Sequence, residues 1–221
     1  MERITDPQKI EDKSFEIIDV LLASSRLPRQ EREVVKRVIH ATTDLDYAGE
    51  LSFHPRAIER ALNAIRGGKN IICDVSMVEA GINKKALANF GGKAVCFIND
   101  EGVIRESFRL NIARAILAMR KASAFMDGAI VSIGNAPTAL FELCDLVKSG
   151  KAKPGLIVGI PVGYVGAADS KKELIASGIP YITNSGTKGG SSVAAAITNA
   201  LLKLAQETVH FRNFAERKKH A

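Results

Sequence analysis

The sequence of 221 residues contains no tryptophan, few other aromatic residues and only three cysteines. Cys73, Cys96 and Cys144 are odd in number and lack CxxC spacing, which argues against a disulfide framework or a zinc knuckle. No zinc-finger or RNP-like spacing occurs, and sparse aromatics give bases no platform for stacking. We therefore expect reduced, mostly buried thiols, no metal site and no nucleic-acid partner.

Long apolar runs are also missing. The first residues, MERITDPQKIEDK, contain no apolar segment of the kind found in secretion signals. The most apolar stretch, residues 155–168, is interrupted by Pro161 and four glycines, which argues against a transmembrane helix. We expect a cytoplasmic protein that does not bind or span a membrane. The formal net charge of +7 would steer an anionic partner toward the chain.

The length fits one domain with a full α/β core, and we expect a single domain over residues 1–221. Its parts are a helical N-terminal segment (residues 1–68), an α/β core (69–207) and a basic C-terminal tail (208–221). The tail contains Arg212, Arg217, Lys218 and Lys219, which fit either a frayed end or a binding patch.

Apolar patterning predicts a doubly wound sheet. Continuous apolar runs are typical of strands buried on both faces, and five occur: Asn70–Val75, Ala94–Ile98, Ala129–Ile133, Leu156–Ile160 and Ile179–Thr183. Helical periodicity predicts helices between and around them: Pro7–Ser24, Gln30–Ala41, Pro55–Ile65, Ser107–Phe125, Pro137–Lys148, Ala167–Ala176 and Ser191–Glu207. This alternation indicates a five-stranded parallel sheet with helices on both faces. The N-terminal helices either pack on it or reach a neighbouring subunit.

A glycine-rich segment follows the last predicted strand. Ligands of such sheets bind beyond the carboxyl ends of the strands, where loops meet helix N-termini. Here Gly186, Lys188, Gly189 and Gly190 precede the helix that begins at Ser191, so free N–H groups and one cation could hold an anion. Tight turns with close helix packing explain the glycines equally well. Neither a Walker loop nor a GxGxxG fingerprint is present.

Two polar side chains interrupt apolar helix faces. Ser14 shares a face with Ile10, Ile17 and Leu21, and a serine there either bonds to a carbonyl of its own helix or belongs to a site. Arg114 lies between apolar positions, where its guanidinium could clamp a carboxylate or form a surface ion pair.

His40 ends the helix that contains Val34, Val38 and Ile39. A helix C-terminus and nearby acids, such as Asp44, favour a protonated imidazole, which can act as a general acid. The alternative is a solvent-exposed cap. No serine-histidine-acid order and no HExxH accompanies it, so hydrolysis is poorly supported.

In order and spacing, several motifs resemble the precorrin-8X methylmutase family, including its cobalt-precorrin-8 branch. They are Ser14-Phe15, the run from Val38 to Thr42 with Asp44, Asp74-Val75, Met77-Val78, Ala80-Gly81, the run from Gly134 to Leu140, the run from Pro161 to Val165, Ser170-Lys171, the run from Lys188 to Ser191, the run from Ala194 to Ala196, and the run from Asn199 to Leu201.

The resemblance implies a flavodoxin-like isomerase of cobalamin biosynthesis that works without a cofactor as a homodimer. Its reaction would move a methyl group from C-11 to C-12 of an anionic tetrapyrrole, precorrin-8X or cobalt-precorrin-8. By analogy His40 is the proton donor. Substrate-binding residues would be Ser14, Thr42, Arg114, Gly186, Lys188, Gly189, Gly190 and Ser191.

The residues agree with this chemistry, because a methyl migration needs a proton and firm orientation but no nucleophile, metal or hydride carrier. A non-catalytic corrinoid carrier and a flavodoxin-like nucleotide or flavin binder remain as alternatives. The sequence leaves open whether the substrate contains cobalt.

Overall fold

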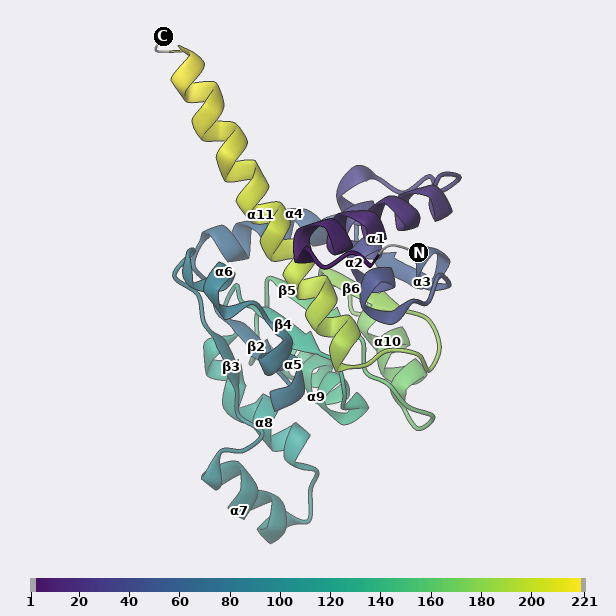
Figure 1. The fold of residues 1–221 in the computed structure, drawn as a ribbon. Helices are drawn as coiled ribbons and strands as arrows, with labels where there is room; N and C mark the ends of the chain where they lie inside the picture. The colour runs from purple at the N-terminus through teal and green to yellow at the C-terminus, as the bar shows by residue number, and fades with distance from the viewer. Residues whose placement is uncertain (1–2, 220–221) are drawn as a thin grey trace.

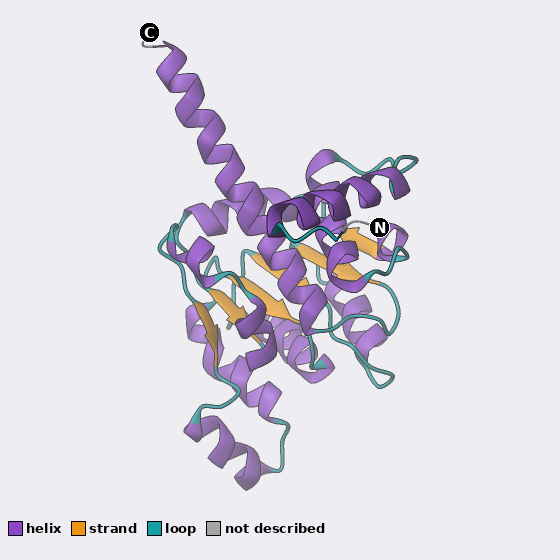
Figure 2. Ribbon diagram, in the orientation of Figure 1, coloured by secondary structure: helices purple, strands orange, loops and turns teal. Residues whose placement is uncertain are grey.

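The computed structural model describes the backbone of residues 3–219 and the side chains of residues 3–207, and its centre is a six-stranded sheet (Figures 1 and 2). The strand order is β1-β6-β5-β4-β2-β3. The strands are β1 (Leu51–Phe53), β2 (Ile71–Cys73), β3 (Ala94–Cys96), β4 (Ile130–Ile133), β5 (Leu156–Gly159) and β6 (Tyr181–Asn184).

Five of the strands, β2 to β6, pair in parallel, and each lies within or overlaps a run that the sequence predicts. The prediction of five strands in all is wrong, because β1 pairs antiparallel with β6, with Leu51 opposite Asn184. Of its three side chains only that of Leu51 is buried, so the sequence around β1 contains no continuous apolar run, and the pairing with β6 places this strand at the sheet edge. The N-terminal segment is therefore not purely helical.

Helices cover both faces of the sheet (Figure 2). On one face α4 and α11 pack against the strands, and on the other the core contains α8, α9 and part of α10. Of the N-terminal helices, α4 thus packs on the sheet, whereas α2 packs on α11 and α1 lies against α2. The helices around the sheet are α1 (Pro7–Leu21), α2 (Arg29–Thr42), α4 (Ala57–Arg66), α8 (Arg114–Ala122), α9 (Pro137–Lys148), α10 (Ala167–Ala176) and α11 (Ser191–Lys219).

One predicted helix is divided. The sequence predicts a continuous helix over Ser107–Phe125, but the chain forms α7 (Glu101–Leu110) and α8, joined by a short turn and followed by a 3₁₀ turn (Ser123–Phe125). Asn111 adopts a left-handed conformation with φ of 52°, and the Ser107 hydroxyl donates to the Ile112 carbonyl at 2.7 Å. Asparagine tolerates this backbone, and the side-chain bond closes the end of α7. Three short helices were also missed: α3 (Tyr47–Glu50), α5 (Ser76–Gly81) and α6 (Lys84–Ala88).

Helix α11 crosses the sheet and continues beyond Glu207, where its predicted end lay (Figure 1). The basic side chains of the predicted tail, Arg212, Arg217, Lys218 and Lys219, lie outside the described side chains. Within the described part of the chain, no helix combines the length and apolar character that a bilayer crossing requires.

Candidate active site

His40 occupies the last turn of α2, at the border between the buried and exposed sides of this helix. Val34, Val35, Val38 and Ile39 are buried among the core residues that α2 shares with α11. The helix ends at Thr43, which has a left-handed φ of 54° and whose N–H donates to the Ile39 carbonyl at 2.7 Å. Packing therefore fixes the backbone beneath a partly exposed imidazole.

Two consecutive residues of α1 contact this imidazole. The Ser14 hydroxyl lies 2.8 Å from His40 Nδ1, and the Phe15 ring stacks on the imidazole with centroids 5.0 Å apart and an interplanar angle of 18°. The hydroxyl of Ser14 therefore contacts a second helix instead of a carbonyl of its own helix. When the imidazole is protonated, Nδ1–H donates to the Ser14 hydroxyl, and the proton on Nε2 is the one that the ring can give up as an acid.

Phe15 also lies close to a group of cations. Arg37, Lys36 and Lys203 place their charges 4.7, 5.4 and 5.8 Å from its ring centroid, respectively. Two cavities beside α1, of about 180 and 430 Å³, are lined by Phe15, Arg37 and Lys203 but not by His40. Within one chain, the imidazole thus lies next to these hollows and not inside them.

Thr42 caps the turn after His40. Its hydroxyl donates to the Val38 carbonyl at 2.9 Å and accepts from the Asp44 N–H at 3.2 Å. Both bonds shape the end of the helix, so the hydroxyl is already engaged in the arrangement that the structure shows.

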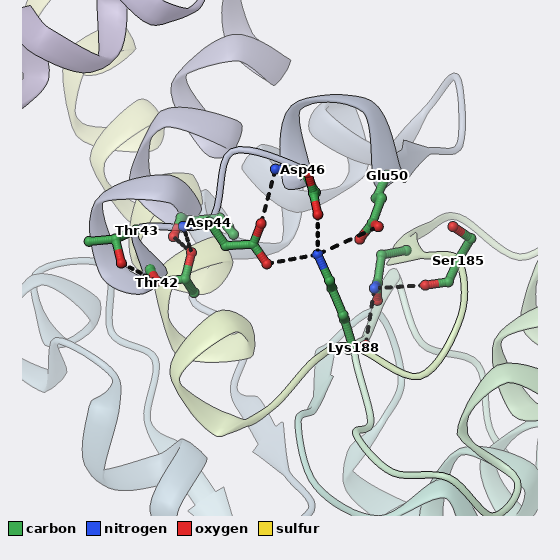
Figure 3. A network of polar contacts seen from close by, with 9 residues as sticks. Thr42, Thr43, Asp44, Asp46, Glu50, Ser185 and Lys188 are labelled. Carbon is green, nitrogen blue, oxygen red and sulfur yellow. Dashed lines mark hydrogen bonds and ion pairs between the residues drawn. The ribbon is translucent and has the colours of Figure 1, made fainter.

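Lys188 connects the segment after His40 to the glycine-rich loop (Figure 3). Its Nζ lies 2.9 Å from Asp44 Oδ2, 2.6 Å from Asp46 Oδ2 and 3.7 Å from Glu50 Oε1. The hydrogen bond from Lys188, together with one from the Asp46 N–H, holds the pKa of Asp44 below its usual value. The same bonds to Asp46 and Asp44 raise the pKa of Lys188. Lys188, which the sequence suggests as a ligand for a bound anion, is therefore paired with carboxylates of the chain itself.

A second lysine fixes the backbone of that loop from inside. Lys171, from α10, is 1% exposed, and its Nζ donates to the carbonyl of Gly186 at 3.0 Å and to that of Lys188. The Asn184 amide donates to the carbonyls of Ser185 and Lys188, each at 3.0 Å. Burial lowers the pKa of Lys171 to about 8. Buried donors thus hold three carbonyls of this loop.

The consecutive glycines of the loop serve close packing. A Cβ on Gly189 would lie 2.5 Å from the Ile160 carbonyl oxygen, and the Gly190 N–H donates to that oxygen at 3.0 Å. Among described residues, no acceptor contacts the N–H groups of Ser191, Ser192 and Val193 in the first turn of α11. The Gly190 N–H is therefore used within the chain, whereas the first-turn N–H groups of α11 are available to an anion.

Comparison with known proteins identifies the family. A model of the precorrin-8X methylmutase family matches residues 9–204. The chain belongs to this family. The cobalt-precorrin-8 methylmutase of Priestia megaterium is 47% identical over 211 residues, which cover 96% of this chain and 94% of that protein. The precorrin-8X methylmutase of Pseudomonas aeruginosa is 38% identical and covers 90% and 96%.

The fold agrees with a solved member of the methylmutase family. The structure of precorrin-8X methyl mutase from Thermus thermophilus matches with a TM-score of 0.86 at 35% identity, covering 91% of this chain and 97% of that one. Relatives in this family include two kinds of isomerase, precorrin-8X methylmutase and cobalt-precorrin-8 methylmutase. Both branches therefore occur among relatives of this chain.

Arg114, expected at the methylmutase site, lies elsewhere in the chain. It begins α8 as an exposed residue, and in the described part of the chain it has no hydrogen bond or ion pair. Figure 1 shows α8 on one side of the sheet and the pair α1 and α2 on the other. One chain therefore brings together Ser14, His40 and the Thr42 turn, but not Arg114.

Asp74, which belongs to the family motifs but has no role assigned from the sequence, is a buried group at the same sheet edge. Asp74, 0% exposed, accepts the N–H groups of Gly134, Asn135 and Ala136 at 3.1, 2.8 and 2.9 Å. Burial raises its pKa, and the three N–H donors oppose that shift. An aspartate directly after a buried strand was the available signal. Within the described residues, no group of three His, Cys, Asp or Glu side chains could hold a metal ion.

Proposed function

We propose that this chain isomerises precorrin-8X or cobalt-precorrin-8 by moving the methyl group from C-11 to C-12, giving hydrogenobyrinate or cobyrinate, with His40 as proton donor. Membership of the methylmutase family supports the substrate class. The single observation that supports the role of His40 is its contact with Ser14, which joins two helices at one imidazole.

The chemistry requires a proton at the macrocycle and a fixed ring. A proton passed from His40 to the conjugated system places positive charge next to C-11, and the methyl group then moves with its bonding electrons to C-12. Loss of a proton from the ring restores the neutral product and recharges the imidazole. Ser14 holds Nδ1 so that Nε2 faces the substrate.

Anionic side chains of the substrate need cations and N–H donors at the rim. We assign the free first-turn N–H groups of α11, beginning at Ser191, to one carboxylate, with Gly186, Gly189 and Gly190 shaping the loop before them. Thr42 keeps the His40 turn in place.

Arg114 fits this site in a homodimer. Because it is exposed, without a partner among the described residues and distant from His40 in one chain, it would address substrate bound to the other subunit. A bidentate guanidinium suits the carboxylates of this ligand.

The sheet supports a flavodoxin-like assignment within this proposal. Its five parallel strands run in the order β3-β2-β4-β5-β6, which is 2-1-3-4-5 when they alone are numbered. Flavodoxin-like sheets have this order and bind ligands at the edge where the strands end.

Replacement of the imidazole tests the proposal. We expect His40→Ala to lower kcat by about 10²-fold or more on the accepted precursor, because general acid catalysis contributes on this scale, with folding retained. The absorbance spectrum of the ring follows turnover with metal-free and cobalt-containing precursor. His54→Ala, which removes an edge contact to Tyr181, is the matched control.

Full activity of His40→Ala would remove His40 from the mechanism. Tight binding of both precursors by the unmodified protein, with no spectral change over many equivalents, would instead indicate a corrinoid carrier.

A further inference from the structure

The charges around Lys188 do not balance. Three carboxylates, from Asp44, Asp46 and Glu50, lie within 4 Å of one ammonium group, so the cluster has two more negative than positive charges. A carboxylate of the substrate would have to displace one of them and approach the others. Repulsion among like charges this close opposes that exchange.

The same cluster joins parts of the chain that are distant in sequence. Lys188 and Asp44 are separated by 144 positions, and their contact links the loop after β6 to the loop that leaves His40 (Figure 3). On the His40 side, the Asp44 N–H donates to Thr42, and Asp44 Oδ1 accepts the Asp46 N–H at 3.0 Å. The position of Asp44 is therefore coupled through Thr42 to the C-terminal turn of α2.

The other side of the link is rigid. Lys171 and Asn184 both donate to the Lys188 carbonyl, and both are buried. The neighbouring Gly189 lies so close to the Ile160 carbonyl that it leaves no room for a Cβ. These contacts fix the backbone position of Lys188, from which its side chain extends to the carboxylates.

We propose that Lys188, anchored by Lys171, is a positioning residue that holds the His40 turn of α2, and that it does not bind a carboxylate of the substrate. The proposal rests on the proposed function for the role of His40. It replaces the expectation that Lys188 is a substrate ligand, because its ammonium is used within the chain.

Amide hydrogen exchange of the unmodified full chain and of Lys188→Met, without substrate, tests the link independently of catalysis. We expect the amides of residues 43–46 to exchange about tenfold faster in the variant, since loss of one network contact changes local stability on this scale. Lys172→Met, which removes an exposed pair with Asp169 at 3.4 Å, is the matched control and leaves that segment unchanged.

Steady-state kinetics on the accepted precursor separate positioning from binding. For Lys188→Met we expect kcat to fall about tenfold with KM within about twofold, because a displaced His40 affects the transition state and not uniform binding. Lys188→Arg, which keeps a cation in reach of the carboxylates, should recover most of kcat and restore slow exchange.

Unchanged exchange over residues 43–46, or a KM raised about tenfold with kcat unchanged, overturns the positioning role. If Lys188→Met does not fold, Asp46→Asn removes the 2.6 Å partner without touching the glycine loop and is judged by the same two measurements. If neither precursor is turned over by the unmodified chain, the proposed function fails, whereas the exchange experiment still decides the link.

Discussion

Two loops at the carboxyl edge of the sheet are held by buried charges of opposite sign. After β4, the Asp74 carboxylate accepts three backbone N–H groups of residues 134–136. After β6, the Lys171 ammonium donates to two carbonyls of residues 186–188. One loop therefore turns its donors inward, and the other turns its acceptors inward.

The two loops differ in what they connect: one begins a helix of the core, and the other carries a side chain to the segment after His40. The loop after β4, residues 134–136, leads directly into α9 at Pro137. Its three N–H groups all donate to the Asp74 carboxylate. The Lys171 loop sends the Lys188 side chain outward to the carboxylates beside His40. A buried anion here holds the backbone at a helix start, whereas a buried cation supports a loop whose Lys188 pairs with Asp44, in the segment that follows His40.

The largest expected effect breaks the first loop. Asp74→Ala leaves three N–H groups, one buried and two partly buried, without their acceptor, and we expect the free energy of unfolding to fall by about 4 kcal/mol. Urea denaturation measures it. The exposed Asp127→Ala should change stability by no more than about 0.5 kcal/mol. A loss for Asp74→Ala as small as that of Asp127→Ala would contradict the structural role of the carboxylate.

The second loop can be broken at its backbone. Gly189→Ala places a Cβ 2.5 Å from one carbonyl oxygen and 2.7 Å from the next, so we expect a loss of about 3 kcal/mol. Gly186→Ala, in the same loop, meets nothing within 4 Å and should cost only about 1 kcal/mol for its φ of +70°. Thermal or urea unfolding of both variants compares them, and equal losses would show that packing at Gly189 is relieved.

The smallest expected effect is the pH dependence of stability that Lys171 causes. The pKa of Lys171 is lowered to about 8 in the fold from its ordinary value of 10.5, so between these values the unfolded chain binds more protons. Relative to Lys171→Met, the free energy of unfolding should therefore rise by about 2 kcal/mol from about pH 7 to about pH 10. Denaturation at several pH values measures the difference, and a flat difference would mean that Lys171 stays charged throughout.

Most strands of the sheet could be predicted from the sequence, because a strand buried on both faces consists of a continuous run of apolar residues. The run that begins at Leu156 is an example. The break at Asn111 could not be predicted, since the helical period continues across it. His40 and Ser14 were both singled out by sequence, but as separate residues. Their hydrogen bond spans 26 positions and two helices, which no local pattern encodes.

The family resemblance supplied the expected site residues, and the structure shows the surroundings of two of them within one chain. Lys188 is engaged by carboxylates whose closeness depends on how α3 packs beside the loop after β6. Arg114 is remote from His40 in one chain because α8 covers the opposite face of the sheet.

By itself, the sequence determined which segments are buried, where most helices lie and which side chains could donate a proton, because these depend on local periodicity and on side-chain chemistry. Only the tertiary structure decided the pairing of β1, the contact of Ser14 with His40 and the capture of Lys188 by three carboxylates. Such contacts depend on distances between segments far apart in the chain, and those distances exist only after the helices have packed on the sheet.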